Sequence, residues 1–207
     1  AAVGAMAGLD VTLTDMNEAA IDGAIARAAK LFERRLKTDD KIAAAKSRLR
    51  ADKDGNGAGD ADLIIEAVAE KLAVKQAVFQ ALEAASKPDA ILATNTSAIP
   101  LEDIATALKA PERLIGLHFF NPVPVLPLVE VIWSKFSDQN MVNRGMQFAG
   151  SLQLILRDEW GGERRKVLLD RVRLPRGKHV GTMSTAIKPQ YRRDQIQTAI
   201  DMDATAA

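Results

Sequence analysis

This chain of 207 residues has a formal net charge of +1 and contains no cysteine. Its 28 basic and 27 acidic side chains nearly cancel, so the overall charge gives no reason to expect a nucleic-acid partner. Without cysteine there are no disulfides and no cysteine-based metal or nucleophile chemistry, and this composition fits a reducing compartment. No apolar run is long enough to span a bilayer, so we expect a cytoplasmic protein whose function depends on a local site.

The first fifty residues predict a strand followed by two helices. The stretch "LDVTLTD", residues 9–15, has the pattern of a strand that ends in Asp15, and Gly8 suits the end of a preceding helix. Asn17 can cap the next helix, and a smaller helix is expected from residue 39. The apolar stripe of the first of these helices consists of Ile21, Ile25, Ala28 and Phe32.

The middle of the chain continues this alternation. Four mostly apolar stretches predict strands: "ADLIIEAV" (61–68), "AILAT" (90–94), "RLIGLHF" (113–119) and "LPLVEVI" (126–132). Apolar residues at helical spacing lie between the first three, and Ser137 can cap a helix that runs to about residue 149. Near-continuous apolar strands separated by helices predict an α/β fold with a mostly parallel sheet covered on both faces.

The alternation is lost after Gly150. The segment "EWGGERRK", residues 159–166, has neither a helical nor a strand period, and the last thirty residues suggest only one element, a helix near 192–202. The basic run at 164–166 lacks interleaved aromatic residues and a recognisable module, so we predict no nucleic-acid site there.

A partial calcium motif occurs in "DKDGNGAGD", residues 52–60. The residues that match the opening of an EF-hand loop are Asp52, Asp54, Asn56 and Gly57. The position of the bidentate glutamate is occupied by Leu63, and a strand pattern follows where a helix is required. We interpret the segment as a polar loop and predict no metal site.

Asp15 at the end of the first predicted strand is compatible with a dinucleotide site. In doubly wound sheets a carboxylate at the end of the second strand binds the adenosine ribose hydroxyls and repels the extra phosphate of NADP. The alternative is that Asp15 is only a turn acid before Asn17. The Gly-rich phosphate loop that would support the first interpretation is not found before this strand.

Three stretches, in order along the chain, resemble the signatures of one enzyme family. They are "LIIEAVAEKLAVKQAVF" (63–79), "ATNTSAIPLEDIA" (93–105) and "LIGLHFFNPVPVLPLVEV" (114–131). The chain resembles the L-3-hydroxyacyl-CoA dehydrogenases of fatty acid β-oxidation over about residues 1–157, and the second stretch is most similar to the multifunctional α-subunits. The resemblance implies a Rossmann-like, doubly wound, mostly parallel sheet that binds NAD and lacks its first strand and Gly-rich loop.

The resemblance also implies roles for individual residues. His118 would be the general base that removes the hydroxyl proton as hydride passes to NAD, Glu130 would fix its tautomer, and Ser97 would hydrogen-bond the substrate oxygen. The implied cofactor-binding residues are Asp15, Glu70, Lys75, Asn95 and Ser97. The implied substrate-binding residues are Ser97, Asn121 and Asp170.

Elementary chemistry supports the His118 and Glu130 assignments. An imidazole titrates near neutrality, which suits proton removal from an alcohol. Glu130 interrupts an apolar strand, where a buried carboxylate is costly unless it is paired. The alternatives are a structural histidine, an exposed Glu130 on an edge strand, and a turn or cap role for Ser97 before Pro100.

The end of the chain departs from the family. "VLLDRVRLP", residues 167–175, looks like an altered form of a family motif, with Asp170 where a substrate-orienting asparagine would lie. We therefore divide the chain into a partial NAD-binding domain, 1–156, and a divergent, disordered remnant of a helical domain, 157–207. Full-length relatives are expected to be oligomeric or part of a multienzyme complex. The alternative function is an inactive fragment that binds only acyl-CoA or a partner chain, since the strands that carry Asp15 and Glu66 would lack their central neighbour.

Overall fold

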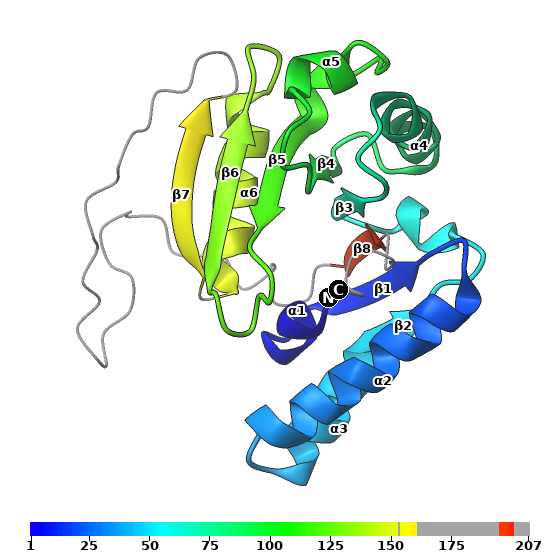
Figure 1. The fold of residues 1–207 in the computed structure, drawn as a ribbon, viewed down its shortest axis with the longest axis vertical. Helices are drawn as coiled ribbons and strands as arrows, with labels where there is room; N and C mark the ends of the chain where they lie inside the picture. Colours follow the sequence, from blue (N-terminus) through cyan, green and yellow to red (C-terminus); the bar gives the residue numbers. More distant parts are fainter. Residues whose placement is uncertain (153, 161–194, 201–207) are drawn as a thin grey trace.

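The computed structural model describes residues 1–152, 154–160 and 195–200 (Figure 1). The described strands are β1 (Asp10–Thr14), β2 (Leu49–Ala51), β3 (Leu63–Ala67), β4 (Ile91–Thr94), β5 (Leu114–Phe119), β6 (Leu128–Trp133), β7 (Ile155–Trp160) and β8 (Gln195–Ile200). The α-helices are α1 (Ala2–Met6), α2 (Glu18–Arg35), α3 (Asp39–Arg48), α4 (Leu72–Ala85), α5 (Leu101–Ala105) and α6 (Gln139–Ser151). Two short 3₁₀ turns are η1 (Asn56–Gly59) and η2 (Pro111–Arg113).

The strands form a single sheet in the order β2-β1-β8-β3-β4-β5-β6-β7. All neighbouring pairs are parallel except β5 and β6, which are antiparallel. This arrangement confirms the predicted α/β fold with a mostly parallel sheet.

Helices cover both faces of the sheet, as the packing of two adjacent residues of β3 shows. Ile64 on β3 packs in a core cluster with Phe79 of α4 and Ile104 of α5. Its neighbour Ile65 belongs to the opposite cluster, which includes apolar side chains of α1, α2, α3 and α6. Successive side chains of a strand point to opposite faces, so the near-continuous apolar strands of the sequence fill two cores at once.

The helix ends agree with the sequence in one case and differ in another. Asn17 caps α2 by accepting a hydrogen bond from the backbone N–H of Ala19 at 3.1 Å, as predicted. Ser137 does not cap α6, because its hydroxyl donates to the carbonyl of Leu114 at 2.7 Å. The Asp138 carboxylate caps that helix, because it accepts hydrogen bonds from the backbone N–H groups two and three residues further along the chain.

The strand β8 lies at the centre of the sheet, between β1 and β3 and parallel to both (Figure 1). Two expectations are therefore wrong: the predicted helix near 192–202 is a strand at 195–200, and β1 and β3 are not left without a neighbour between them. The physical reason is backbone pairing. A central position in a parallel sheet offers N–H and C=O groups on both sides, and a segment with β-branched residues at alternate positions can satisfy them.

Replacing Thr198 by proline tests this role of β8. Thr198 is paired in register with Leu13 on one side and Ile65 on the other, so the substitution removes an N–H from the interior of the sheet. We expect the free energy of unfolding of the 207-residue chain to fall by about 1–3 kcal/mol, measured by urea denaturation. Thr198→Val, which keeps the N–H, is the control. Equal stability of the two variants would show that β8 does not hold the sheet.

Candidate active site

The sequence-predicted site residues gather at one edge of the sheet. The strands β1, β3, β4 and β5 are mutually parallel through β8, so their carboxyl ends share that edge. Asp15 follows β1, Glu70 follows β3, Asn95 follows β4, and His118 is the penultimate residue of β5. Ligands of doubly wound folds bind at this edge, which makes it the candidate site.

His118 and Glu130 form a cross-strand pair. They are directly opposite in the antiparallel register of β5 and β6, and Nδ1 of His118 lies 2.9 Å from Oε2 of Glu130. The exposed fraction is 21% for the His118 side chain and 11% for Glu130. Because β6 has β5 on one side and β7 on the other, the edge-strand alternative for Glu130 is wrong. A carboxylate at Nδ1 favours the tautomer whose Nε2 is free to accept a proton.

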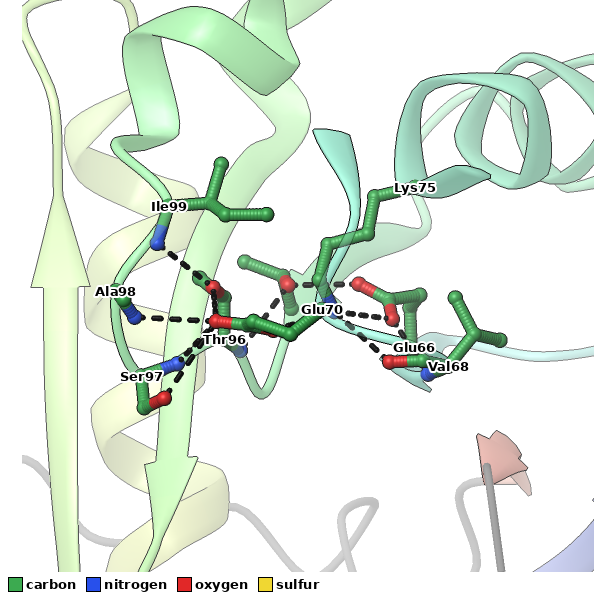
Figure 2. A network of polar contacts seen from close by, with 9 residues as sticks. Glu66, Val68, Glu70, Lys75, Thr96, Ser97, Ala98 and Ile99 are labelled. Carbon is green, nitrogen blue, oxygen red and sulfur yellow. Dashed lines mark hydrogen bonds and ion pairs between the residues drawn. The ribbon is translucent and has the colours of Figure 1, made fainter. Parts of the chain in front are cut away.

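A second buried carboxylate, Glu66 on β3, pairs with Lys75 on α4 (Figure 2). The Lys75 ammonium lies 2.8 Å from Oε1 of Glu66, and the two side chains are 1% and 0% exposed. The same ammonium donates to the carbonyl of Val68 at 3.2 Å and lies 3.2 Å from Oε2 of Glu70. The other oxygen of Glu66 accepts from the hydroxyl of Thr94 at 2.7 Å.

Glu70 holds the loop that follows β4. Its Oε1 accepts a hydrogen bond from the hydroxyl of Thr96 and from the backbone N–H groups of Ser97 and Ala98, at 3.0 and 3.1 Å for the two amides (Figure 2). Burial acts to raise the pKa of Glu70, but hydrogen bonds from Thr96 and Lys75 and the charge of Lys75 outweigh it and lower that pKa. At neutral pH this carboxylate is an ionised anchor for the loop.

Asn95 and Asn121 have different surroundings. The side-chain oxygen of Asn95 accepts from the backbone N–H of Phe119 at 2.9 Å and so joins the end of β4 to the end of β5, beside His118. Asn121 is exposed, in the loop after β5. Within the described ranges, Ser97 and Asn121 form no hydrogen bond with His118, although all three lie at the same sheet edge.

Asp15 makes the turn contact that its position allows. Its Oδ1 accepts from the backbone N–H of Asn17 at 2.8 Å, which is the contact expected of a turn acid. One carboxylate oxygen can serve the turn while the other binds a ligand, so the cofactor role of Asp15 stays a prediction. Asp170 lies outside the described residues.

In the loop at 52–60, the first acidic side chain forms hydrogen bonds within the protein. The Asp52 carboxylate accepts hydrogen bonds from the backbone N–H groups of Asn56 and Gly57, at 3.1 and 2.9 Å, and from the hydroxyl of Thr14. In the part of the chain that the structure describes, no group of three or more His, Asp or Glu residues is arranged to hold a metal ion. Among the described residues, no helix has the length and hydropathy of a membrane span.

Sequence reasoning missed two residues of this site, Glu66 and Thr96. The signal for Glu66 was available, because it interrupts the apolar strand β3 just as Glu130 interrupts β6, and a buried carboxylate requires a partner. Thr96 gave no comparable signal. Its hydroxyl becomes important only because β3 and β4 are neighbours, which brings Glu70 to it.

Comparison with known families identifies the family of this chain. The model of the 3-hydroxyacyl-CoA dehydrogenase NAD-binding domain matches residues 1–154. The chain belongs to the 3-hydroxyacyl-CoA dehydrogenase family. The sequence resemblance is therefore confirmed, and so is the Rossmann-like class of the sheet.

Two curated relatives resemble the chain in sequence. It is 41% identical over 157 residues to a 3-hydroxybutyryl-CoA dehydrogenase of Mycobacterium tuberculosis, covering 73% of this chain and 55% of the relative. It is 40% identical over 149 residues to a fatty acid oxidation complex subunit alpha of Pseudomonas entomophila, covering 70% of this chain and 21% of the relative. The chain thus spans about half or less of these relatives.

Two solved structures resemble this chain in fold and sequence. The FadB2 structure of M. tuberculosis has a TM-score of 0.73 and 38% identity, and the match covers 80% of this chain and 60% of that one. The 3-hydroxybutyryl-CoA dehydrogenase of Escherichia coli has a TM-score of 0.71 and 35% identity, with 77% and 35% of the two chains covered.

Acid titration of the 207-residue chain tests the anchoring role of Glu70. The pKa of Glu70 is lower in the folded state than in the unfolded state. Its carboxylate therefore stabilises the folded state at pH values above the unfolded pKa, and this stabilisation is lost as the pH falls through the folded pKa. We expect the NMR amide signals of Ser97 and Ala98 to shift together with a midpoint below about 4.3, the ordinary pKa of glutamate. Glu70→Gln should abolish this transition, whereas Glu112→Gln, at an exposed position, should retain it. A midpoint above that value would contradict the anchor.

Proposed function

We propose that this chain carries the NAD-binding half of an L-3-hydroxyacyl-CoA dehydrogenase that oxidises L-3-hydroxyacyl-CoA to 3-oxoacyl-CoA in fatty acid β-oxidation. The observation that carries the proposal is the pairing of His118 Nδ1 with Glu130 at 2.9 Å, at the carboxyl edge of a sheet whose family binds NAD. Because the chain spans about half of its 3-hydroxybutyryl-CoA dehydrogenase relative, the activity is proposed for the whole enzyme.

The proposed chemistry divides one oxidation between a proton and a hydride. His118 accepts the proton of the substrate hydroxyl at Nε2, and Glu130 at Nδ1 stabilises the imidazolium that forms. The Ser97 hydroxyl donates a hydrogen bond to the substrate oxygen, and Asn121 and Asp170 contact the acyl-CoA. NAD, when bound, supplies the hydride acceptor.

The residues at the sheet edge fit the ribose and nicotinamide parts of NAD. Asp15 is a half-buried carboxylate at the end of β1, the position that binds ribose hydroxyls in such sheets. By family resemblance Glu70, Lys75, Asn95 and Ser97 surround the nicotinamide and its ribose, and all four follow β3 or β4 at the same edge. No Gly-x-Gly-x-x-Gly run precedes β1 in this sequence, so we assign no pyrophosphate contact.

Partners and location follow from the relatives and the composition. The 40% identity to a fatty acid oxidation complex subunit alpha supports membership of an oligomeric or multienzyme assembly. The absence of cysteine supports a cytoplasmic location. The alternative, a non-catalytic fragment that only binds acyl-CoA or a partner chain, is separated from this proposal by turnover in an enzyme of full length.

The test of the base uses a chimera in which residues 1–154 replace the matching part of the M. tuberculosis 3-hydroxybutyryl-CoA dehydrogenase. We expect His118→Gln to lower NADH formation by ~10²-fold or more with little change in NADH affinity, because the proton acceptor is lost. Glu130→Gln should lower it by roughly tenfold or more, whereas Glu112→Gln, an exposed substitution of the same kind, should not. Undiminished turnover in the His118 variant would sink the assignment. A chimera without any turnover would favour the non-catalytic alternative.

Cofactor choice tests Asp15 in the same chimera. A carboxylate that binds ribose hydroxyls repels a 2′-phosphate, so Asp15→Ala should narrow the preference for NAD over NADP by about tenfold, measured as the ratio of dissociation constants. Asp22→Ala, on the exposed side of α2, should leave that ratio unchanged. If the two variants behave alike, Asp15 is only the turn acid that contacts Asn17.

A further inference from the structure

The polar loop that follows β2 is attached to the core of the protein. Ala58, in the turn η1, is 1% exposed and belongs to the buried cluster that contains Phe79 of α4. Just before η1, the Asp52 carboxylate accepts hydrogen bonds from the backbone N–H groups of Asn56 at 3.1 Å and Gly57 at 2.9 Å. Because these hydrogen bonds close the loop on itself and Ala58 holds it to the core, Asp52 has a fixed position.

Asp52 also joins this loop to the end of β1. Its backbone N–H donates to the carbonyl of Leu13 at 2.8 Å, which extends the pairing of β1 with β2 by one residue. The hydroxyl oxygen of Thr14 lies 3.0 Å from the carbonyl oxygen of Asp52 and 3.1 Å from its Oδ2, so one hydroxyl proton is shared between two acceptors. Thr14 directly precedes Asp15, so these contacts hold the strand side of the turn that carries the Asp15 carboxylate.

A second contact reaches the helix side of the same turn. The ammonium of Lys53 lies 2.6 Å from Oε2 of Glu18, the first residue of α2. The two side chains are 45% and 64% exposed, and an ion pair in water contributes little by itself. The half-buried contact between Thr14 and Asp52 is therefore the main connection, and the Lys53 contact is secondary.

The turn between these two contacts carries the candidate ribose-binding group. Met16 at its tip is fully exposed, and Oδ1 of Asp15 accepts from the backbone N–H of Asn17 at 2.8 Å. This hydrogen bond joins the Asp15 side chain to its own turn. The direction of the carboxylate therefore depends on how firmly the backbone on each side of the turn is held.

We propose that Asp52 is a positioning residue that acts through Thr14 to fix the turn carrying Asp15, with Lys53 in a secondary role. The acid that resembles the first ligand of an EF-hand loop thus orders the cofactor edge of the sheet. The effect on cofactor choice rests on the function proposed above for Asp15, whereas the ordering of the turn does not.

The first test measures amide hydrogen exchange by NMR in the 207-residue chain without any ligand. Thr14→Val removes the shared proton but keeps the branched shape, and Asp52 retains its two amide donors, so the fold should persist. We expect the Asn17 amide to exchange at least about threefold faster, with the buried Val11 amide of β1 unchanged. Thr14→Ser restores the hydroxyl and should restore the parental rate.

A double-mutant cycle tests whether Asp52 acts through Thr14. Asp52→Asn, which removes the charge, should also speed exchange at Asn17, but it should add little in a chain that already carries Thr14→Val. Parental exchange at Asn17 in both single variants would overturn the proposal. Fully additive effects would also overturn it, because Asp52 would then act by another route.

The ion pair at the other end of α2 provides a matched control for Lys53. Lys46 lies 2.7 Å from Glu33, and the two side chains are 44% and 57% exposed. Lys53→Met should speed exchange at Asn17 by less than Thr14→Val does, whereas Lys46→Met should leave it unchanged. Equal effects of the two lysine variants would contradict the secondary role of Lys53.

The second test measures cofactor choice in the chimera described above. Thr14→Val should narrow the preference for NAD over NADP by about threefold, less than Asp15→Ala does, because the carboxylate is still present but less well held. Thr14→Ser should keep the parental preference. If Asp15→Ala narrows the preference and Thr14→Val does not, Asp52 and Thr14 do not position Asp15 for the cofactor. The exchange measurements need no cofactor, so they decide the positioning claim even if the ribose role of Asp15 fails.

Discussion

The site depends on one constraint, that a carboxylate buried in a sheet must have a positive or hydrogen-bonding partner. Glu66 on β3 and Glu130 on β6 are both almost fully buried among apolar strand residues. One is paired with Lys75 from the helix that follows its own strand, and the other with His118 from the antiparallel neighbour. These two pairings bring an ammonium and an imidazole to the edge where the parallel strands end, so the requirement of burial also assembles the chemical groups.

The two pairs differ in how far their basic side chains are exposed. The Lys75 side chain is 1% exposed, and its ammonium contacts Glu66, the carbonyl of Val68 and Glu70 in this structure. His118 uses one ring nitrogen for Glu130 and is 21% exposed, so its second nitrogen can serve a reactant. An imidazole that uses only one ring nitrogen inside the protein suits proton transfer.

Backbone pairing explains the most unexpected element. The strands β1 and β3 carry much of the core and would expose two rows of backbone groups if the place between them were open. In the structure β8, more than a hundred residues later in the chain, lies in that place, in register with both neighbours. The sheet order is thus that of a doubly wound fold, although the strand at its centre comes from the end of the described chain.

The sequence by itself predicted most strands and helices of the first 150 residues, because apolar spacing dictates which backbone periodicity buries the core, but it did not predict the short strand β2. It also determined that Glu130 needed a partner, and the family motif pointed to His118. Only the tertiary structure decided which groups meet: Glu70 with the Ser97 loop, Lys75 between two carboxylates, Asp138 instead of Ser137 at the start of α6, and β8 as a central strand. Local patterns record the preference of each segment for one conformation, whereas hydrogen-bond partners distant in sequence depend on strand order, which no local pattern contains.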